Sequence, residues 1–285
     1  MDLTEINQLK QILQDNNIWP DKRMGQNFLI SKSVLEKIIA TADIKDTDTI
    51  LEIGPGLGTL TYELGKTAKL VLGIEKDRKL VEFLRKRFKS AKNIKIVCED
   101  ILKYNYQPTT YDYKVISNLP YNITSPVINK LLNLEHKPQE MVLMVQKEVA
   151  ERLCAKPGNS DRGILTVIIE YFCDAEIIEI VPRNNFYPVP DVDSAIIKLT
   201  LKKINKLTKK QIDESSFFRF VKMGFGQKRR QIHHSLSAGL YLAKPQIFAI
   251  LKSVNISHTK RAEELSLTDW INLYDETQKF LGKVR

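Results

Sequence analysis

The sequence predicts an α/β protein with a mostly parallel sheet, followed by a small all-helical domain at the C-terminal end. From residue 49 onward, short apolar segments alternate with segments of helical spacing, the pattern of strands joined by crossover helices. The apolar segments lack regular polar alternation, as is typical of strands buried on both faces. After residue 204 the apolar residues recur only at helical spacing.

The expected elements follow in order along the chain. A helix over 3–13 precedes a Gly-containing loop, KRMGQNFL (22–29), and a helix over 33–40 follows it. The seven expected strands lie at 49–53, 69–75, 93–99, 113–117, 141–146, 176–181 and 194–201. Helices are expected over 59–67, 77–89 and 163–173, although the last segment is also compatible with a strand. The four C-terminal helices are expected at 215–226, 228–240, 245–253 and 268–281.

The charge distribution divides the chain in two. Its 285 residues are enough for about two domains. Residues 1–203 hold 29 Lys and Arg against 27 Asp and Glu, whereas residues 204–285 hold 15 against 7. We therefore expect a near-neutral catalytic domain over 1–203, in which 1–30 form a helix and a covering loop. We expect the basic domain over 204–285 to bind a polyanion.

Several classes of protein are disfavoured. The three cysteines are widely spaced and form no CxxC pair, so neither a disulfide framework nor a zinc site is expected. The four histidines are isolated, or adjacent and so directed differently on a helix, and we expect no metal ion. No apolar run approaches about 18 residues and the start is not a signal peptide, so we expect no membrane span and a cytoplasmic location. A monomer is the working expectation.

A glycine-rich turn and two acids suggest a nucleoside cofactor. Gly54 and Gly56, in IGPGLG, lie where the first strand of the sheet meets its helix, and allow a close approach to a ligand. Glu75 ends the second strand, where a carboxylate can accept hydrogen bonds from a ribose diol. Asp100, after the third strand, can reach an adenine amino group. Because the spacing is GxGxG rather than GxGxxG, S-adenosylmethionine is favoured over a pyrophosphate-bearing cofactor.

The segment Asn118-Leu119-Pro120-Tyr121 follows the fourth strand directly. The amide oxygen of Asn118 and the carbonyl of Leu119 can accept hydrogen bonds from an exocyclic amine, Pro120 stiffens the turn, and Tyr121 offers a ring for an extruded base. By itself this segment is equally compatible with a turn whose Tyr packs. Phe186, in a Pro-rich loop, either closes the other face of the base or belongs to the core, and the residues alone do not decide.

Four segments, KRMGQNFL, LEIGPGLGTLT, NLPYNITSP and FYPVPDVDSAIIKL, together resemble the ribosomal RNA adenine N6-dimethyltransferase family over about residues 20–280. The resemblance implies a class I, Rossmann-like methyltransferase with a seven-stranded sheet. It implies dimethylation of two adjacent adenosines in the 3′-terminal hairpin loop of 16S rRNA, within the 30S subunit or its precursor. An Erm-type enzyme for 23S rRNA and a non-catalytic assembly or transcription factor are alternatives. RAEELSLTDWINL (261–273) favours the small-subunit enzyme, and the intact Asn118–Tyr121 segment favours catalysis.

The resemblance also implies roles for individual residues. The target base is placed between Tyr121 and Phe186. The cofactor contacts are Asn27, Leu29, Gly54, Gly56, Glu75, Asp100 and Asn118. The basic C-terminal helices resemble the RNA-docking domain of the family, and the run of cations there, rather than the resemblance, makes Lys228, Arg229 and Arg230 the RNA-binding candidates. Met24 and the stretch Gln231–His234 depart from the family pattern, which leaves the details of RNA contact open.

Overall fold

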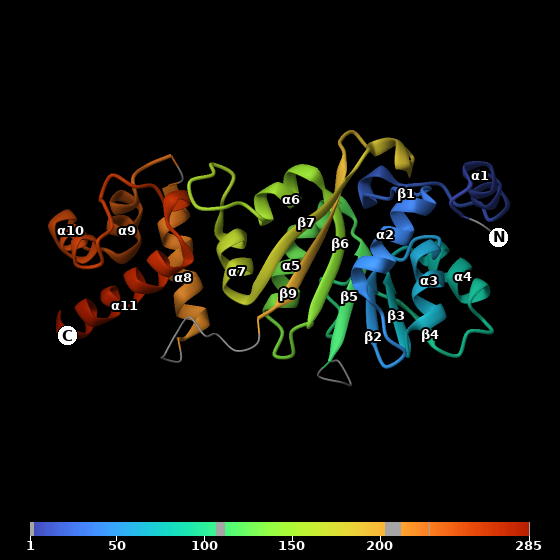
Figure 1. The fold of residues 1–285 in the computed structure, drawn as a ribbon, viewed down its shortest axis with the longest axis horizontal. Coiled ribbons are helices and arrows are strands. Elements are labelled where there is room, and N and C mark those ends of the chain that lie inside the picture. The colour runs from blue at the N-terminus through green and yellow to red at the C-terminus, as the bar shows by residue number, and fades with distance from the viewer. Residues whose placement is uncertain (1–2, 107–111, 203–211, 228, 285) are drawn as a thin grey trace. The chain divides into compact units, whose positions relative to one another are not determined.

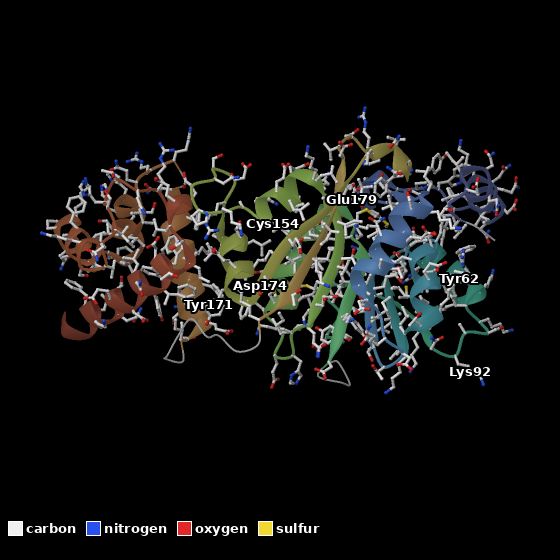
Figure 2. The ribbon with its side chains drawn as sticks, viewed as in Figure 1. Tyr62, Lys92, Cys154, Tyr171, Asp174 and Glu179 are labelled. Atoms are coloured by element: carbon white, nitrogen blue, oxygen red, sulfur yellow. The ribbon has the colours of Figure 1, made fainter. Side chains whose placement is uncertain are left out.

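The computed structural model (Figure 1) describes residues 3–106, 112–202, 212–227 and 229–284. The contacts divide the chain into two compact units: Met1–Ala150 with Ala175–Leu201, and Glu151–Asp174 with Lys202–Arg285. A single boundary near residue 203 was expected. The structure differs because the segment Glu151–Asp174 belongs to the second unit rather than to the first. It groups with the C-terminal helices because Tyr171 (Figure 2) packs its ring 5.5 Å from Phe217 and 5.2 Å from Phe218.

The first unit is built on a seven-stranded sheet with the order β4-β3-β2-β5-β6-β9-β7. The strands are β2 (Thr49–Ile53), β3 (Leu70–Glu75), β4 (Ile94–Cys98), β5 (Tyr113–Asn118), β6 (Glu140–Gln146), β7 (Cys173–Val181) and β9 (Ser194–Leu201). β2 to β6 pair in parallel and β9 runs antiparallel to β6, which confirms the expected mostly parallel sheet. Because β2 lies between β3 and β5, the chain reverses direction across the sheet there, and ligands bind at such a point in open α/β sheets.

Helices precede and connect these strands. They are α1 (Ile6–Asp15), α2 (Lys32–Ala42), α3 (Thr59–Thr67), α4 (Arg78–Arg87), α5 (Thr124–Leu132) and α6 (Lys147–Leu153), with 3₁₀ turns η1 (Lys22–Met24), η2 (Tyr121–Ile123) and η3 (Arg183–Asn185). The core between α2, α3 and the sheet contains fully buried Leu64, Ile50 and Ile116. β1 (Phe28–Leu29) and β8 (Phe186–Tyr187) form a second, antiparallel sheet. The sequence did not predict this pairing, nor α5 and α6.

The second unit is helical, as expected for the C-terminal region. It contains α7 (Ile164–Phe172), α8 (Glu214–Gly224), η4 (Phe225–Gln227), α9 (Ile232–Leu240), α10 (Lys244–Ser253), η5 (Ala262–Glu264) and α11 (Leu267–Val284). Its core is aromatic: Trp270 is fully buried, and its ring stacks on Phe225 with the centroids 5.6 Å apart. Within the described ranges, no helix combines the length and apolarity that a membrane crossing requires.

Candidate active site

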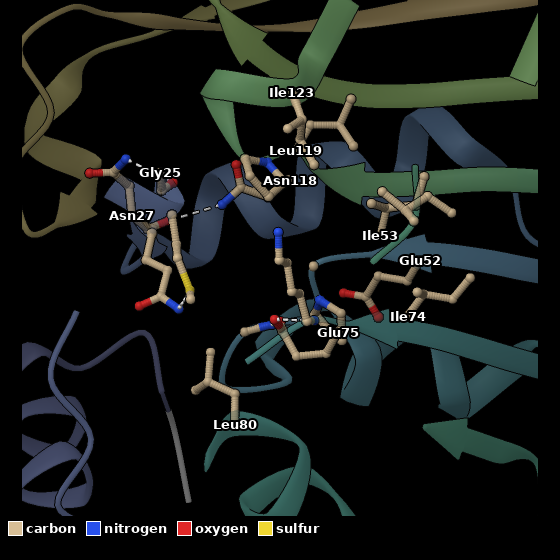
Figure 3. Close-up of a pocket in the computed structure, with 18 of the residues that line it drawn as sticks. Gly25, Asn27, Glu52, Ile53, Ile74, Glu75, Leu80, Asn118, Leu119 and Ile123 are labelled. Carbon is tan, nitrogen blue, oxygen red and sulfur yellow. Dashed lines mark hydrogen bonds between the residues drawn. The ribbon is translucent and has the colours of Figure 1, made fainter. Parts of the chain in front are cut away.

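A cavity opens at the carboxyl ends of β2, β3 and β5, where the strand order reverses (Figure 3). The structure brings together ten of the eleven residues predicted for the cofactor or for catalysis. The lining includes Asn27, Leu29, Gly54, Gly56, Glu75, Asp100, Asn118, Leu119, Pro120 and Tyr121. These residues come from five separate stretches of sequence, so their convergence is a property of the fold.

The glycine turn after β2 forms one wall of the cavity. Gly54 and Gly56 have positive φ angles of 65° and 60°, which L side chains rarely adopt. A Cβ atom on Gly54 would lie 3.1 Å from the Pro120 ring, and one on Gly56 would lie 3.2 Å from the ring of Phe28. The turn therefore presents bare backbone to the cavity, and a larger residue at either position would be strained.

Glu75 fixes this turn from the end of β3. One of its carboxylate oxygens accepts the N–H of Gly56 (3.1 Å), and the other accepts those of Lys76 (2.8 Å) and Asp77 (2.9 Å). Glu75 is buried, and desolvation raises its pKa, while these three donors act in the opposite direction. Since Oε2 accepts only the Gly56 N–H, it can accept a further hydrogen bond, and Glu75 can still bind a ligand hydroxyl.

Asp100 is half-buried beyond the end of β4. Its carboxylate accepts hydrogen bonds from the Lys76 ammonium (2.9 Å) and from the backbone N–H of Leu102 (3.0 Å). The Lys76 side chain is the main reason why the pKa of Asp100 is lowered. Asp100 is thus a fixed anionic acceptor at the edge of the cavity.

Glu52 is a cavity residue that the sequence analysis missed. It lies within β2, is only 2% exposed, and its Oε2 atom has no hydrogen-bond partner among the described residues. Burial raises its pKa from 4.5 to about 8. The sequence could have indicated this residue, because Glu52 is a carboxylate inside the apolar segment TILEI. A strand buried on both faces keeps such a side chain out of solvent.

Asn118 ends β5 with its side-chain amide in a fixed orientation. The Nδ2 atom donates to the backbone carbonyl of Asn27 (3.1 Å; Figure 3), which directs the amide oxygen away from that contact. Asn118 and Leu119 both line the cavity. The amide oxygen of Asn118 and the backbone carbonyl of Leu119 are therefore candidate acceptors for N–H groups of a ligand.

The two aromatic candidates differ in their placement. Tyr121 lines the cavity, and its hydroxyl is 2.6 Å from that of buried Ser194, which fixes the ring. Phe186 is 0% exposed, pairs with Leu29 through β1 and β8, and belongs to the core rather than to the cavity lining. The expectation that Phe186 closes the second face of a base is therefore not met in this conformation, because its ring fills the core beside β1.

The loop over residues 21–30 covers the cavity and is held at two points. Gln26 donates to the Asp77 carboxylate at the start of α4 (3.1 Å), and its own amide oxygen accepts the N–H of Asp21 (2.8 Å). Asn122 of η2 donates to the carbonyl of Arg23 (3.0 Å). Gly25, Gln26 and Asn27 of this loop line the cavity.

Comparison with known proteins identifies the fold and the family. The family model described as ribosomal RNA adenine dimethylase matches residues 20–279. The chain belongs to this family. A protein of Dehalococcoides mccartyi named ribosomal RNA small subunit methyltransferase A is 40% identical over 93% of this chain and 91% of its own length. A protein of the same name from Clostridioides difficile is 40% identical over 94% of each chain.

Two solved structures resemble this member of the adenine dimethylase family over most of its length. A dimethyladenosine transferase from Plasmodium falciparum has a TM-score of 0.76 and 29% identity, covering 88% of this chain and 98% of its own. The 23S rRNA methyltransferase ErmE has a TM-score of 0.71 and 26% identity, covering 88% and 100%. The sheet of this chain is therefore the class I methyltransferase fold that the sequence motifs implied.

Two of the three RNA-binding candidates lie in the described part of the helical unit. Arg229 and Arg230 are exposed immediately before α9, and Lys228 lies outside the described residues. The described part of the chain holds no cluster of three or more His, Cys, Asp or Glu side chains arranged to bind a metal ion. The candidate site is thus the cavity of the first unit, with basic side chains presented on the second.

Proposed function

We propose that this protein transfers methyl groups from S-adenosylmethionine to the N6 atoms of two adjacent adenosines in 16S rRNA. S-adenosylmethionine, when bound, supplies an electrophilic methyl group. Family membership over residues 20–279 supports adenine dimethylation, and the two small-subunit relatives above support the 16S substrate over 23S rRNA. The expected setting is the 30S subunit or its precursor in the cytoplasm, with the enzyme acting as a monomer.

The observation that carries this proposal is the orientation of Asn118. The N6 atom of adenine is a weak nucleophile because its lone pair is delocalised into the ring. Two acceptors that bind its two hydrogens favour a pyramidal nitrogen, in which the lone pair is localised on N6 and available to attack the methyl group. The amide oxygen of Asn118, set by the hydrogen bond to Asn27, and the Leu119 carbonyl supply these acceptors without a strong base.

The cavity fits the cofactor. The bare backbone at Gly54 and Gly56 accommodates close approach, and Glu75 and Asp100 offer carboxylate oxygens to ribose hydroxyls and to the adenine amino group. The orphaned Oε2 of Glu52 is an acceptor that a donor group of the ligand can satisfy. Asn27 and Leu29 belong to the covering loop and exclude water from the same cavity.

Tyr121 supplies a fixed ring for the target base. Base stacking on an aromatic side chain contributes about 1–3 kcal/mol, and the hydrogen bond to Ser194 holds this ring in place. A role for Phe186 on the other face requires β1 and β8 to separate when RNA binds. The basic helical unit, with Arg229 and Arg230, is proposed to bind the phosphate backbone of the rRNA.

Mass spectrometry of nucleosides tests this function. Under-methylated 30S particles and unmodified 23S rRNA are incubated in parallel with the protein and labelled S-adenosylmethionine. We expect N6,N6-dimethyladenosine only in the 16S rRNA. Product only in 23S rRNA would favour the Erm-type alternative, which the ErmE structure keeps in view. No product in either, together with no cofactor-induced rise in the thermal transition, would favour a non-catalytic RNA-binding protein.

A further inference from the structure

A second cavity lies in the first unit, between one face of α2 and one face of α3. It has a volume of about 530 Å³, with an apolar floor that includes Leu3, Leu35 and Ile39. The lining positions on α3 are Thr59, Tyr62, Glu63 and Lys66, which share one helical face. This cavity, called the Tyr62 cavity below, has no role in the methyl transfer proposed above.

The charge of the Tyr62 cavity favours an anion. Its lining holds three cations, Lys32, Lys66 and Arg87, against two carboxylates, Glu36 and Glu63. The Lys66 ammonium binds both oxygens of Glu63 (2.8 and 2.7 Å), so that pair is neutral. The remaining charged side chains of the lining are the cations Lys32 and Arg87 and the carboxylate Glu36. Their sum is one net positive charge.

Arg87 is the most informative of these cations. Its guanidinium is half-buried, and no carboxylate in the described ranges pairs with it. Desolvation lowers its pKa. A guanidinium that has lost water without gaining a counter-ion is a favourable site for a phosphate oxygen, which it can bind through two parallel N–H groups.

Tyr62 adds an aromatic surface beside these cations. It is 49% exposed on α3 (Figure 2) and is among the large apolar side chains that the described residues leave exposed. The Lys66 ammonium lies 4.7 Å from the centroid of its ring, and the Arg87 guanidinium carbon lies 5.8 Å from it. An exposed ring flanked by cations is the arrangement that binds unpaired nucleotides, with the base on the ring and the phosphate on the cations.

The Tyr62 cavity adjoins the proposed cofactor cavity. Thr59 lines both, and Arg87 donates to the carbonyl of Leu57, which belongs to the glycine turn (3.3 Å). A phosphate bound by Arg87 therefore contacts a side chain that also holds the turn.

We propose that the Tyr62 cavity binds an unpaired nucleotide of the RNA substrate, with the base against Tyr62 and the phosphate against Arg87. This nucleotide is distinct from the methylated adenosines. The inference rests on the proposed function only in taking the ligand to be RNA. Glu36 lines the same cavity and can accept a hydrogen bond from a base amino group or a ribose hydroxyl.

Binding of a short fluorescein-labelled oligoadenylate tests the proposal, measured by anisotropy with S-adenosylhomocysteine saturating the cofactor cavity. We expect Tyr62→Ala and Arg87→Gln each to weaken binding about tenfold, and Tyr62→Phe to bind like the wild type because it keeps the ring. Lys86→Gln is the matched control. It removes one positive charge at the neighbouring, exposed position of α4 and should change affinity by less than about twofold.

Photo-cross-linking locates the contact independently. An oligomer that carries 4-thiouridine should cross-link to the peptide that contains Tyr62. Equal affinities for the wild type, Tyr62→Ala and Arg87→Gln, in variants whose thermal unfolding is intact, would overturn the proposal. So would Tyr62-dependent binding of adenosine monophosphate without any Tyr62-dependent binding of the oligomer. The 30S methylation assay is separate, so loss of the proposed function and loss of this site give different results.

Discussion

At the scale of single residues, the site separates what a sequence motif can predict from what it cannot. The motif placed Asn118 at the cavity, but only the structure shows that Asn27 orients its amide. The motif left Phe186 undecided and the family resemblance placed it at the target base, whereas the side chain lies in the core. An aromatic residue in a Pro-rich loop is compatible with both places, because burial depends on partners distant in the sequence.

Glu52 gives a residue-scale prediction about pH. Because burial raises its pKa to about 8, folded protein holds a proton that unfolded protein releases near pH 4.5. The free energy of unfolding should therefore fall as pH rises from about 4.5 to about 8. Glu52→Gln keeps the shape of the side chain and removes its titration. The free energy of unfolding of this variant should therefore be close to that of the wild type near pH 4.5 and higher than that of the wild type at pH 8.

Thermal unfolding between pH 5 and 8, without cofactor, measures this difference. Glu82→Gln, at an exposed position of α4, is the control and should follow the wild-type curve. Parallel curves for Glu52→Gln and the wild type would show that Glu52 does not titrate in this range.

At the scale of elements, the strands were the most predictable part of the fold. All seven strands of the main sheet lie within a few residues of their expected positions, because uninterrupted apolar segments of this length leave few alternatives. The β1–β8 pair was not predictable. Each strand has only two residues, and the paired residues Leu29 and Phe186 are far apart in the sequence, so no local pattern indicates the pairing.

The glycine turn gives an element-scale prediction. Gly56→Ala places a Cβ atom 3.2 Å from Phe28 at a φ of 60°, and strain of this kind costs about 1–3 kcal/mol. We expect a lower thermal transition and at least tenfold weaker binding of S-adenosylmethionine, measured by calorimetry. Gly226→Ala is the control, since a Cβ there meets nothing within 4 Å. Unchanged cofactor affinity in Gly56→Ala would remove the turn from the binding site.

At the scale of the whole molecule, the basic excess of the C-terminal residues was visible in the composition, but the extent of the helical unit was not. Residues 151–174 precede the charged region and join it through aromatic packing, which no local pattern shows. The RNA-binding role of this unit stays a prediction based on its charge.

Salt dependence tests that role. The double variant Arg229→Ala/Arg230→Ala should bind rRNA more weakly. The slope of log affinity against log salt concentration should become shallower by about one to two. Each phosphate contact that is lost reduces the number of counter-ions released when the RNA binds. The control Lys92→Ala/Lys95→Ala removes the same charge from exposed positions of the first unit and should leave the slope nearly unchanged. Equal slopes for both double variants would place the RNA contacts elsewhere.

The most direct measurement of the central claim is single-turnover methyl transfer by Asn118→Ala on under-methylated 30S particles, alongside RNA binding by the same variant. The loss of one of two acceptors for the adenine amine predicts a rate at least 100-fold lower, about 3 kcal/mol, with RNA affinity within about twofold of the wild type. Methyl transfer at the wild-type rate would contradict the claim that Asn118 positions the amine beside the cofactor cavity.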